Sequence, residues 1–290
     1  MTMQQLKIFI AVAECGKMNV AAKQLFLSQP SVSQAVQEIE KQYNIRLFDR
    51  LNQKLYLTET GAELLAAARH VVDAFDTLDA TLKNIGETEK IRIGASVSVG
   101  TCLLVPLVSA AEKSGIELRV LVNNTALVES RLLDSRLDIG IVEGRVESAE
   151  LVQVPLCKDE LVMLVGRYHP LYGAKNVTLA QLDGAGYIAR EDGSATRNQY
   201  EQILVERGIT LCQKWNCTNT EAIKNAVMGG KALAILSRRM VEREVKSGAL
   251  YVLPVQDACA VRNIKLIYHR NKYLSPALQK LIVLIRKTVQ

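Results

Sequence analysis

Neutral side chains that both donate and accept hydrogen bonds are concentrated between residues 29 and 37. They are Gln29, Ser31, Ser33, Gln34 and Gln37. An amide group donates and accepts at once and can pair with the edge of adenine in a DNA major groove. The basic residues Lys23, Arg50 and Lys54 flank this stretch in the sequence and are suited to contacting phosphates. A small helical domain with a solvated polar face would carry the same residue types, so the elements that position them decide between the two interpretations.

Three helices are predicted around this stretch. The first has an apolar stripe at helical spacing, made of Leu6, Phe9, Ile10 and Ala13, and Gly16 ends it. A short second helix covers residues 20–26. Ser28 fits a helix N-cap and Pro30 fits the first turn, so a third helix begins there. Its buried face holds Val32, Ala35, Val36 and Ile39, which leaves the polar side chains on the other face.

A pair of short strands follows the three helices. Residues 46–50 and 54–58 have strand patterns on either side of a turn at 51–53. Three helices and a β-wing are the layout of a winged helix-turn-helix, whose third helix enters the major groove. We therefore expect residues 1–58 to form a DNA-binding domain.

The next segment, residues 59–89, is predicted to be one long helix with Thr58 as its N-cap. Its apolar residues are separated alternately by four and three positions: Leu64, Ala68, Val71, Phe75, Leu78, Leu82 and Ile85. A strict heptad seam of this length favours pairing with a second helix. A helix packed on its own domain is the alternative, so dimerisation is a hypothesis here.

Hydroxyl and glycine residues follow two strands predicted in the C-terminal part of the chain. Ser96, Ser98, Gly100 and Thr101 come after a strand at 91–94, and Gly193, Ser194 and Thr196 come after a strand at 186–189. In open parallel sheets, ligands bind beyond the carboxyl ends of strands, where helix N-termini present unpaired N–H groups. We expect the two turns to face one cleft that binds a small anion such as a carboxylate or a sulfur or phosphorus oxyanion. Helix caps without a ligand are the alternative for each turn.

Two carboxylates and two cysteines raise further hypotheses. Glu143 and Glu221 lie near strand or helix ends that could line the cleft. A buried carboxylate repels an anion unless it is protonated or paired, for which Arg197 is a candidate, and it could instead select an amine or hydroxyl group or cap a helix. Cys212 and Cys217 suggest thiol-disulfide sensing, although residues five apart in a strand point to opposite faces. Reduced core thiols are the simpler interpretation.

The composition limits the class of protein. The chain has 290 residues, 49% of them hydrophobic, and a net charge of +6, so it can bury a core and is not a disordered or fibrous protein. The longest uncharged stretch, 93–111, contains too many glycine, serine and proline residues for a transmembrane helix, and we expect a cytoplasmic protein. The 6 cysteines and 3 histidines show no metal-ligand spacing. We predict neither a metal, nor a cofactor, nor an enzyme active site.

The pattern of residues 90–290 predicts the second fold class. Short strands alternate with helices, which indicates an α/β domain with a mostly parallel sheet and helices on both faces. About 200 residues are enough for two such lobes.

Several motifs resemble one family of regulators. The run 21–33, then Ile39-Glu40, 47–50 and Leu57-Thr58-x-x-Gly61, resembles the N-terminal signature of LysR-type transcriptional regulators. In the C-terminal part, Leu133 with 138–143, His169-Pro170-Leu171 and the turn 191–197 are similar to less specific family motifs. The chain departs from the family at Met18-Asn19-Val20 and at Ala195, which replaces the second glycine of a Gly-Ser-Gly-Thr-Arg turn.

The resemblance implies an architecture and a function. It implies a coiled-coil linker helix and a bilobed α/β effector domain that resembles type 2 periplasmic binding proteins, with lobe I at about 90–161 plus 266–290 and lobe II at about 162–265. It also implies a homotetramer, assembled as a dimer of dimers, that binds inverted-repeat promoter DNA and a small-molecule effector and contacts RNA polymerase. The alternatives are a redox-responsive regulator that uses Cys212 and Cys217, or a solute-binding protein.

Overall fold

The computed structural model describes residues 1–51, 54–83, 89–256 and 260–289. The chain forms two compact units. One contains the N-terminal region together with the short segments 133–135 and 271–275, and the other contains the rest of the chain. Some residues discussed above lie outside the described residues. They are Asn52 and Gln53 of the predicted turn, Ile85 of the heptad seam and Cys259, one of the 6 cysteines.

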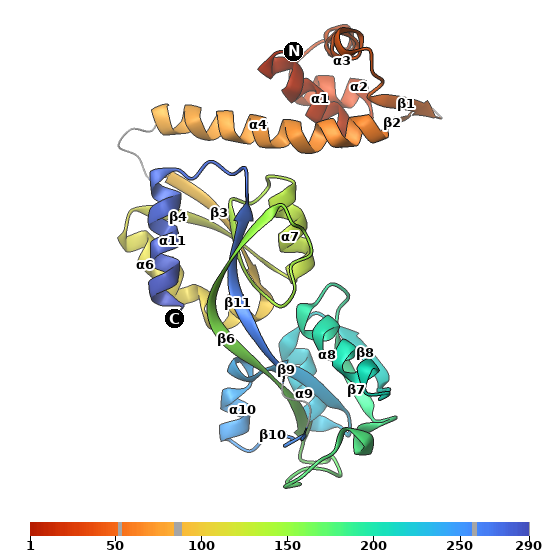
Figure 1. The fold of residues 1–290 in the computed structure, drawn as a ribbon, viewed down its shortest axis with the longest axis vertical. Helices are drawn as coiled ribbons and strands as arrows, with labels where there is room; N and C mark the ends of the chain where they lie inside the picture. The colour runs from red at the N-terminus through yellow and green to blue at the C-terminus, as the bar shows by residue number, and fades with distance from the viewer. Residues whose placement is uncertain (52–53, 84–88, 257–259, 290) are drawn as a thin grey trace. The chain divides into compact units, whose positions relative to one another are not determined.

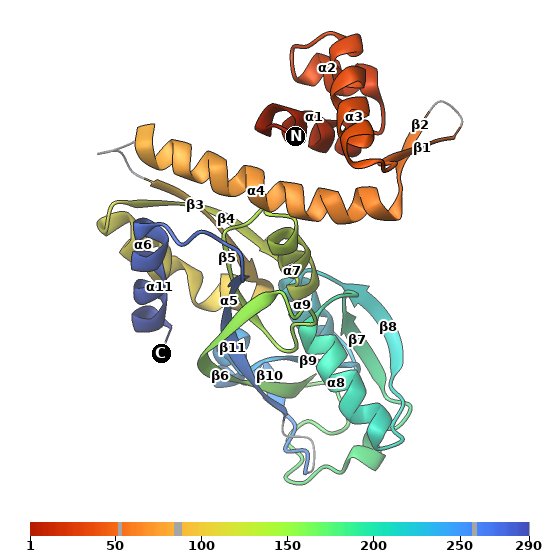
Figure 2. The same cartoon turned by 45° about the horizontal axis from the view of Figure 1, so that its top comes forward.

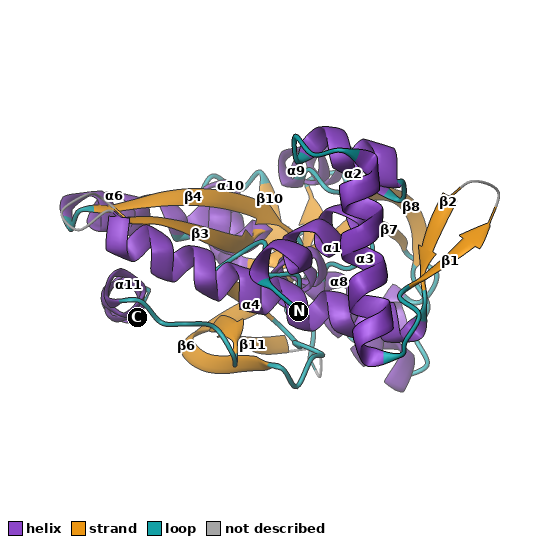
Figure 3. Cartoon of the chain, turned by 90° about the horizontal axis from the view of Figure 1, so that it is seen from above, coloured by secondary structure: helices purple, strands orange, loops and turns teal. Residues whose placement is uncertain are grey.

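The N-terminal unit contains three helices, a hairpin and a long helix. They are α1 (Met3–Cys15), α2 (Met18–Gln24), α3 (Gln29–Tyr43), β1 (Phe48–Leu51), β2 (Lys54–Leu57) and α4 (Glu59–Lys83). Helix α1 ends because Gly16 adopts φ 63°, and the Gly16 carbonyl then accepts a hydrogen bond of 3.0 Å from Leu55 of the hairpin. Figures 2 and 3 show the β1–β2 hairpin projecting from these helices as a wing.

The ends of α2, α3 and α4 are set by local residues. Helix α2 begins at Met18, two residues before the predicted start at 20, because Lys17 is the last residue with extended backbone. At α3 the Ser28 hydroxyl accepts the Ser31 N–H at 3.2 Å, and at α4 the Thr58 hydroxyl accepts the Gly61 N–H at 3.0 Å. A Cβ atom at Gly61 would collide with the backbone carbonyl of Leu47, so the close approach of helix and loop requires glycine there.

The C-terminal unit is built on a single mixed sheet. Its nine described strands are β3 (Glu89–Ser96), β4 (Ile116–Asn123), β5 (Ile139–Glu143), β6 (Leu151–Gly166), β7 (Gly186–Arg190), β8 (Cys212–Cys217), β9 (Leu233–Ser237), β10 (Leu250–Val252) and β11 (Ala260–His269). The order is β4-β3-β5-β11-β6-β9-β7-β8, with β10 also pairing with β6. Strands β3, β4 and β5 are parallel in one lobe, and β7, β8 and β9 are parallel in the other.

The expectation of a mostly parallel sheet was wrong at the centre. Strands β6 and β11 are long, antiparallel to each other and to their other neighbours, and run from one lobe into the other, as Figure 1 shows. Within these two strands, a strand pattern in the sequence covers only 161–165 and 264–268. The earlier part of β6 lacks one because it carries polar residues such as Lys158, Asp159 and Glu160. These two strands connect the lobes.

Helices cover both faces of the sheet. They are α5 (Val97–Cys102), α6 (Leu104–Lys113), α7 (Thr125–Leu133), α8 (Ala195–Glu206), α9 (Thr220–Gly229), α10 (Glu242–Lys246) and α11 (Pro276–Thr288), with 3-10 turns at Leu179–Leu182 and Arg238–Met240. Alternate residues of β9 pack into two different cores: Leu233 and Ile235 with Tyr200 of α8, and Ala234 and Leu236 on the opposite face. None of the described helices has the length and hydropathy needed to cross a bilayer.

Candidate DNA-binding surface and effector pocket

The predicted recognition residues lie on the exposed side of α3. Gln29, Gln34 and Gln37 are exposed, and Ser33 is partly buried. The Gln34 side chain donates to Glu38 at 2.9 Å, which leaves its carbonyl oxygen as an acceptor. Ser28, Pro30 and Ser31 form the start of the helix, where the two hydroxyls lie 2.7 Å apart and satisfy each other.

Two of the three predicted phosphate contacts lie near the start of α3. A hollow of about 400 Å³ is lined by Lys17, Met18, Asn19, Gln29, Arg50, Lys54 and Leu55. It brings together Arg50 and Lys54 of the wing with Gln29, whereas Lys23 is exposed in the last turn of α2 and does not line the hollow. The sequence interpretation missed Lys17 and Asn19, although the departure from the family pattern at 18–20 marked this segment.

The predicted heptad seam of α4 serves two purposes. Leu64 and Ala68 pack against the core of the N-terminal unit. Leu64 remains partly exposed, whereas Ala68 is only 2% exposed and is not available to another helix. The next four seam residues are 46 to 63% exposed: Val71, Phe75, Leu78 and Leu82. The part of the seam open to a partner therefore begins at Val71.

The centre of the C-terminal unit contains a buried arginine that no motif indicated. Arg262 of β11 is 4% exposed, and its Nε lies 2.8 Å from Asp159 Oδ2 of β6. Its Nη2 lies 3.5 Å from Glu143 Oε1 of β5. Glu143 is thus paired with Arg262, and the predicted partner Arg197 instead pairs with Asp192 and Glu201. One guanidinium faces two buried carboxylates.

Hydroxyl groups from both lobes complete this cluster. Ser96 and Ser98 of lobe I both donate to the Glu143 carboxylate, the latter at 3.1 Å. From lobe II, Thr196 Oγ1 accepts from Arg262 Nη1 at 2.9 Å. Ser237 of β9, which the sequence interpretation missed together with Arg262 and Asp159, donates to Asp159 at 2.6 Å. The structure thus brings together Ser96, Ser98, Glu143 and Thr196 of the predicted effector-binding set.

The other predicted effector residues have different surroundings. Thr101 is exposed and donates to the Val97 carbonyl at 2.8 Å, and Gly100 packs against Val122. Ser194 is buried at the start of α8 with no capping hydrogen bond from its side chain. Glu221 is exposed on α9, pairs with Lys224 at 2.5 Å and does not line the pocket described below.

The lobes approach each other closely at the second predicted turn, around Gly193 and Ala195. A Cβ atom at Gly144 would lie 2.7 Å from the Cβ of Ala195, so the residue that replaces the family glycine fills the space opposite Gly144. Gly193 adopts φ 80°, and the neighbouring Asp192 carbonyl accepts from Asn124 of lobe I at 3.2 Å. These contacts hold the lobes together beside the buried cluster.

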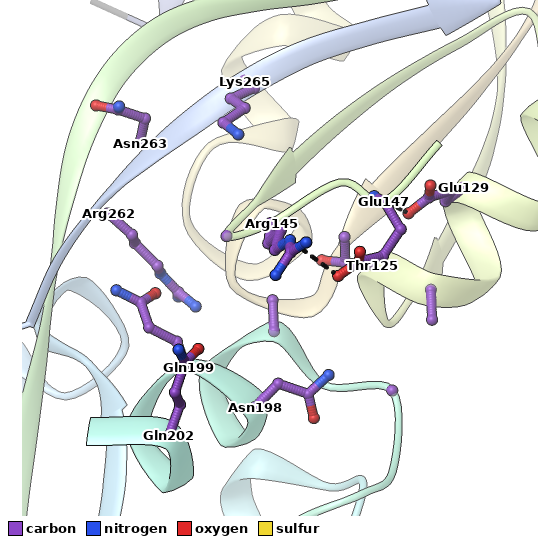
Figure 4. Close-up of a pocket in the computed structure, with 14 residues that line it drawn as sticks. Thr125, Glu129, Arg145, Glu147, Asn198, Gln199, Gln202, Arg262, Asn263 and Lys265 are labelled. Carbon is purple, nitrogen blue, oxygen red and sulfur yellow. Dashed lines mark hydrogen bonds and ion pairs between the residues drawn. The ribbon is translucent and has the colours of Figure 1, made fainter. Parts of the chain in front are cut away.

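A polar pocket of about 460 Å³ lies between the lobes next to Arg262. Its polar lining consists of Thr125, Glu129, Arg145, Glu147, Asn198, Gln199, Gln202, Arg262, Asn263 and Lys265. In Figure 4, Thr125 and Arg145 of lobe I lie opposite Asn198 of α8. The Gln199 Oε1 atom is buried and accepts no hydrogen bond from any described residue. The volume lies in the range of small-molecule sites.

The cysteines do not support thiol-disulfide sensing by the predicted pair. Cys212 and Cys217 are both on β8 without a disulfide, and five residues of extended strand span roughly 16 Å. A disulfide needs Cα atoms within about 7 Å. Burial raises the pKa of the Cys102 and Cys157 thiols, which disfavours the reactive thiolate. The redox alternative is therefore not favoured.

Comparisons with known proteins identify the class. Residues 84–290 match the family model of the LysR substrate binding domain, and residues 3–62 match that of the bacterial regulatory helix-turn-helix proteins of the lysR family. The HTH-type transcriptional regulator YeiE of Escherichia coli (strain K12) is 33% identical over 284 residues, which cover 97% of this chain and 96% of that protein.

Solved structures share the fold. ArgP from Mycobacterium tuberculosis has a TM-score of 0.77 at 17% identity and covers 99% of this chain and 96% of its own. The regulatory domain of Synechocystis PCC6803 CcmR, solved in complex with 2-PG, has a TM-score of 0.65 at 23% identity and covers 70% of this chain and 98% of its own.

The chain belongs to the LysR family of transcriptional regulators. This membership confirms the predicted fold class and the predicted function, a DNA-binding regulator with an effector-binding domain. It excludes the solute-binding alternative, since the helix-turn-helix match covers the N-terminal residues.

Proposed function

We propose that two copies of the chain pair through the exposed part of the α4 seam and present their α3 helices to a spaced inverted repeat in promoter DNA. Two such dimers join into a tetramer, and a small anionic molecule between the two lobes controls promoter contact and recruitment of RNA polymerase. A regulator of this kind acts in the cytoplasm.

The Arg262 side chain is the observation that carries the effector part of this proposal. It lies on a strand shared by the two lobes and hydrogen-bonds to Ser98 of lobe I and Thr196 of lobe II, at 3.3 and 2.9 Å. A ligand that changes the partners of Arg262 therefore has different affinities for different arrangements of the lobes, as control by a ligand requires. The 2-PG complex of the CcmR regulatory domain supports a small anion as ligand.

The DNA part is tested with the full chain and duplexes from the neighbouring promoter region. A duplex with a T-x11-A inverted half-site pair should shift in a gel at moderate salt, and a scrambled duplex should shift only at higher protein concentration. Failure of every promoter duplex to shift would refute the assignment of α3 as the reading helix.

The effector part is tested by two substitutions in different lobes. Ser96→Ala and Thr196→Ala should abolish the transcriptional response to the effector and leave DNA binding intact, because each removes one hydroxyl of the interlobe cluster. Thr101→Ala is the matched control, since its hydroxyl is exposed and donates to the Val97 carbonyl of its own helix. A normal response in both cluster variants would refute the site.

A further inference from the structure

Three groups that suit an oxyanion already surround a carboxylate of the protein. The hydroxyls of Ser96 and Ser98 donate to the two oxygens of Glu143, and Arg262 Nη2 lies 3.5 Å from Glu143 Oε1. All four residues are at most 4% exposed. Two hydroxyl donors and a guanidinium are the groups that bind carboxylates, phosphates and sulfur oxyanions. We refer to Ser96, Ser98 and Arg262 as the cradle.

Arg262 does not need Glu143 to balance its charge. Asp159 lies 2.8 Å from both Nε and Nη2 of Arg262 and also accepts from Ser237. The buried cluster of Glu143, Asp159 and Arg262 thus holds one more negative than positive charge. Among the described residues, the further cation that pairs with it is the half-exposed Arg239, 3.9 Å from Asp159. A surplus buried carboxylate is costly, so its position calls for a reason other than stability.

The cradle adjoins the pocket between the lobes through one of its members, Arg262. Arg262 itself lines the pocket, as do Gly144, which follows Glu143, and Ala195, which precedes Thr196. Thr125, also in the lining, donates to the Glu143 backbone carbonyl at 3.2 Å. A small anion in the pocket would therefore meet Arg262 first, and would reach Ser96 and Ser98 only after Glu143 had moved away from them.

We propose that Glu143 is a built-in competitor whose carboxylate occupies the cradle until an oxyanion effector replaces it. Two like charges cannot share these donors, so the ligand and Glu143 exclude each other. The affinity for the effector is then reduced by the fraction of molecules in which Glu143 covers the cradle. This inference rests on the proposed effector site and specifies the ligand as a small molecule with a carboxylate, phosphate or sulfur oxyanion group.

The test compares anion affinity in charge-matched variants of the full chain by isothermal titration calorimetry. The probes are acetate, inorganic phosphate and sulfate, which separate the three oxyanion classes. Glu143→Gln and Glu143→Ala should bind at least one probe about tenfold or more tightly than the unmodified chain, because the donors are released. Glu160→Gln removes the same charge next to Asp159 but from a half-exposed side chain paired with Arg238, and should change affinity less than about threefold.

Three results would overturn the inference. They are affinities in the Glu143 variants equal to or weaker than in the unmodified chain, an equal gain in Glu160→Gln, and no binding of any probe to any variant. If Glu143→Ala does not fold, as thermal unfolding would show, the isosteric Glu143→Gln carries the test. Failure of the proposed function would be recognised differently. The chain would then not shift promoter DNA or respond to an effector, regardless of the affinities of the variants for the oxyanion probes.

Discussion

Arg262 and Asp159 form a buried ion pair between the two strands that connect the lobes, with Arg262 Nε 2.8 Å from Asp159 Oδ2. The two residues are 103 positions apart in the sequence. Glu143, at the end of β5, pairs with the same guanidinium. The cluster therefore links β6 and β11, which connect the lobes, to β5 of lobe I. The stability of the C-terminal unit and its response to a ligand therefore depend on the same side chains.

Removing the cation of this cluster should be more damaging than removing one anion. Arg262→Ala leaves Glu143 and Asp159 buried without their cation and should lower the free energy of unfolding by about 3–5 kcal/mol. Asp159→Asn should cost less, because Arg262 keeps Glu143 as a partner. Urea denaturation of both variants checks the order, and equal losses would contradict the described pairing.

The substitution Gln199→Leu in the pocket should affect the stability of the fold and the effector response differently. The Gln199 Oε1 atom is buried and has no hydrogen-bond donor among the described residues, so an apolar side chain of similar size should leave stability unchanged or raise it by about 1 kcal/mol. The same variant should weaken the effector response if the ligand supplies the missing donor. Gln213→Leu, on the exposed strand β8, is the control for both measurements.

Two side chains that line the same hollow should affect DNA binding differently. Gln29→Ala should cost about 1–3 kcal/mol on the cognate site and less on random DNA, because an amide reads base edges. Lys54→Ala should weaken binding equally on both and lower the salt slope by about 1, because a lysine contacts phosphate. Fluorescence anisotropy at several salt concentrations checks both, and equal losses for Gln29→Ala on the two DNAs would show that Gln29 does not read bases.

The exposed part of the α4 seam predicts the effect of a charge on assembly. Phe75→Glu places a carboxylate in the centre of the apolar stripe and should shift the chain toward smaller species in sedimentation experiments. Ala66→Glu adds the same charge to an exposed position of α4 outside the seam and should leave the mass unchanged. Unchanged assembly in Phe75→Glu would exclude α4 as the dimer contact.

The Lys224–Glu244 pair predicts a loss of stability in acid. Burial is the largest single influence and opposes ionisation of Glu244. The hydrogen bond to Lys224, a backbone hydrogen bond and the positive charges of Lys224 and Arg243 together outweigh burial and hold the pKa of Glu244 below its usual value. A lowered pKa in the folded state gives stability that is present above the unfolded value of 4.5 and is lost as the pH falls through the folded value. Glu244→Gln should therefore lose less stability below about pH 4.5 than the unmodified chain, measured by urea denaturation at several pH values. Parallel pH curves would show that the pair makes no pH-dependent contribution.

The local parts of the architecture could be predicted from the sequence because their signals are local. Ser28 and Thr58 cap helices within three residues of themselves, and the wing is a hairpin of adjacent segments. Periodicity also indicated most of the strands and helices of the C-terminal unit. The gathering of Ser96, Ser98 and Thr196 was expected from general properties of open sheets, without any pairwise signal.

The centre of the site could not be predicted, because its contacts join residues that lie far apart in the sequence. Arg262 reaches Ser98 across 164 positions, and in a single sequence it is one of several charged residues in an alternating strand. Only the packing of β11 against β6 shows that it is buried. Likewise, the apolar spacing of α4 could not distinguish Ala68, which packs within its own unit, from Phe75, which is exposed.

Gly144 and Ala195 lie so close together that the approach of the two lobes at this point depends on the presence or absence of a single carbon atom. Neither residue has a side chain that can rotate away, so the gap has almost no tolerance for a larger neighbour. A larger side chain at Ala195 would limit how closely the lobes approach, whereas a side chain at Gly144 would also strain the backbone, because Gly144 has φ 81°. The chain therefore offers a position at which closure can be adjusted by size alone, without altering any hydrogen bond or charge of the buried cluster.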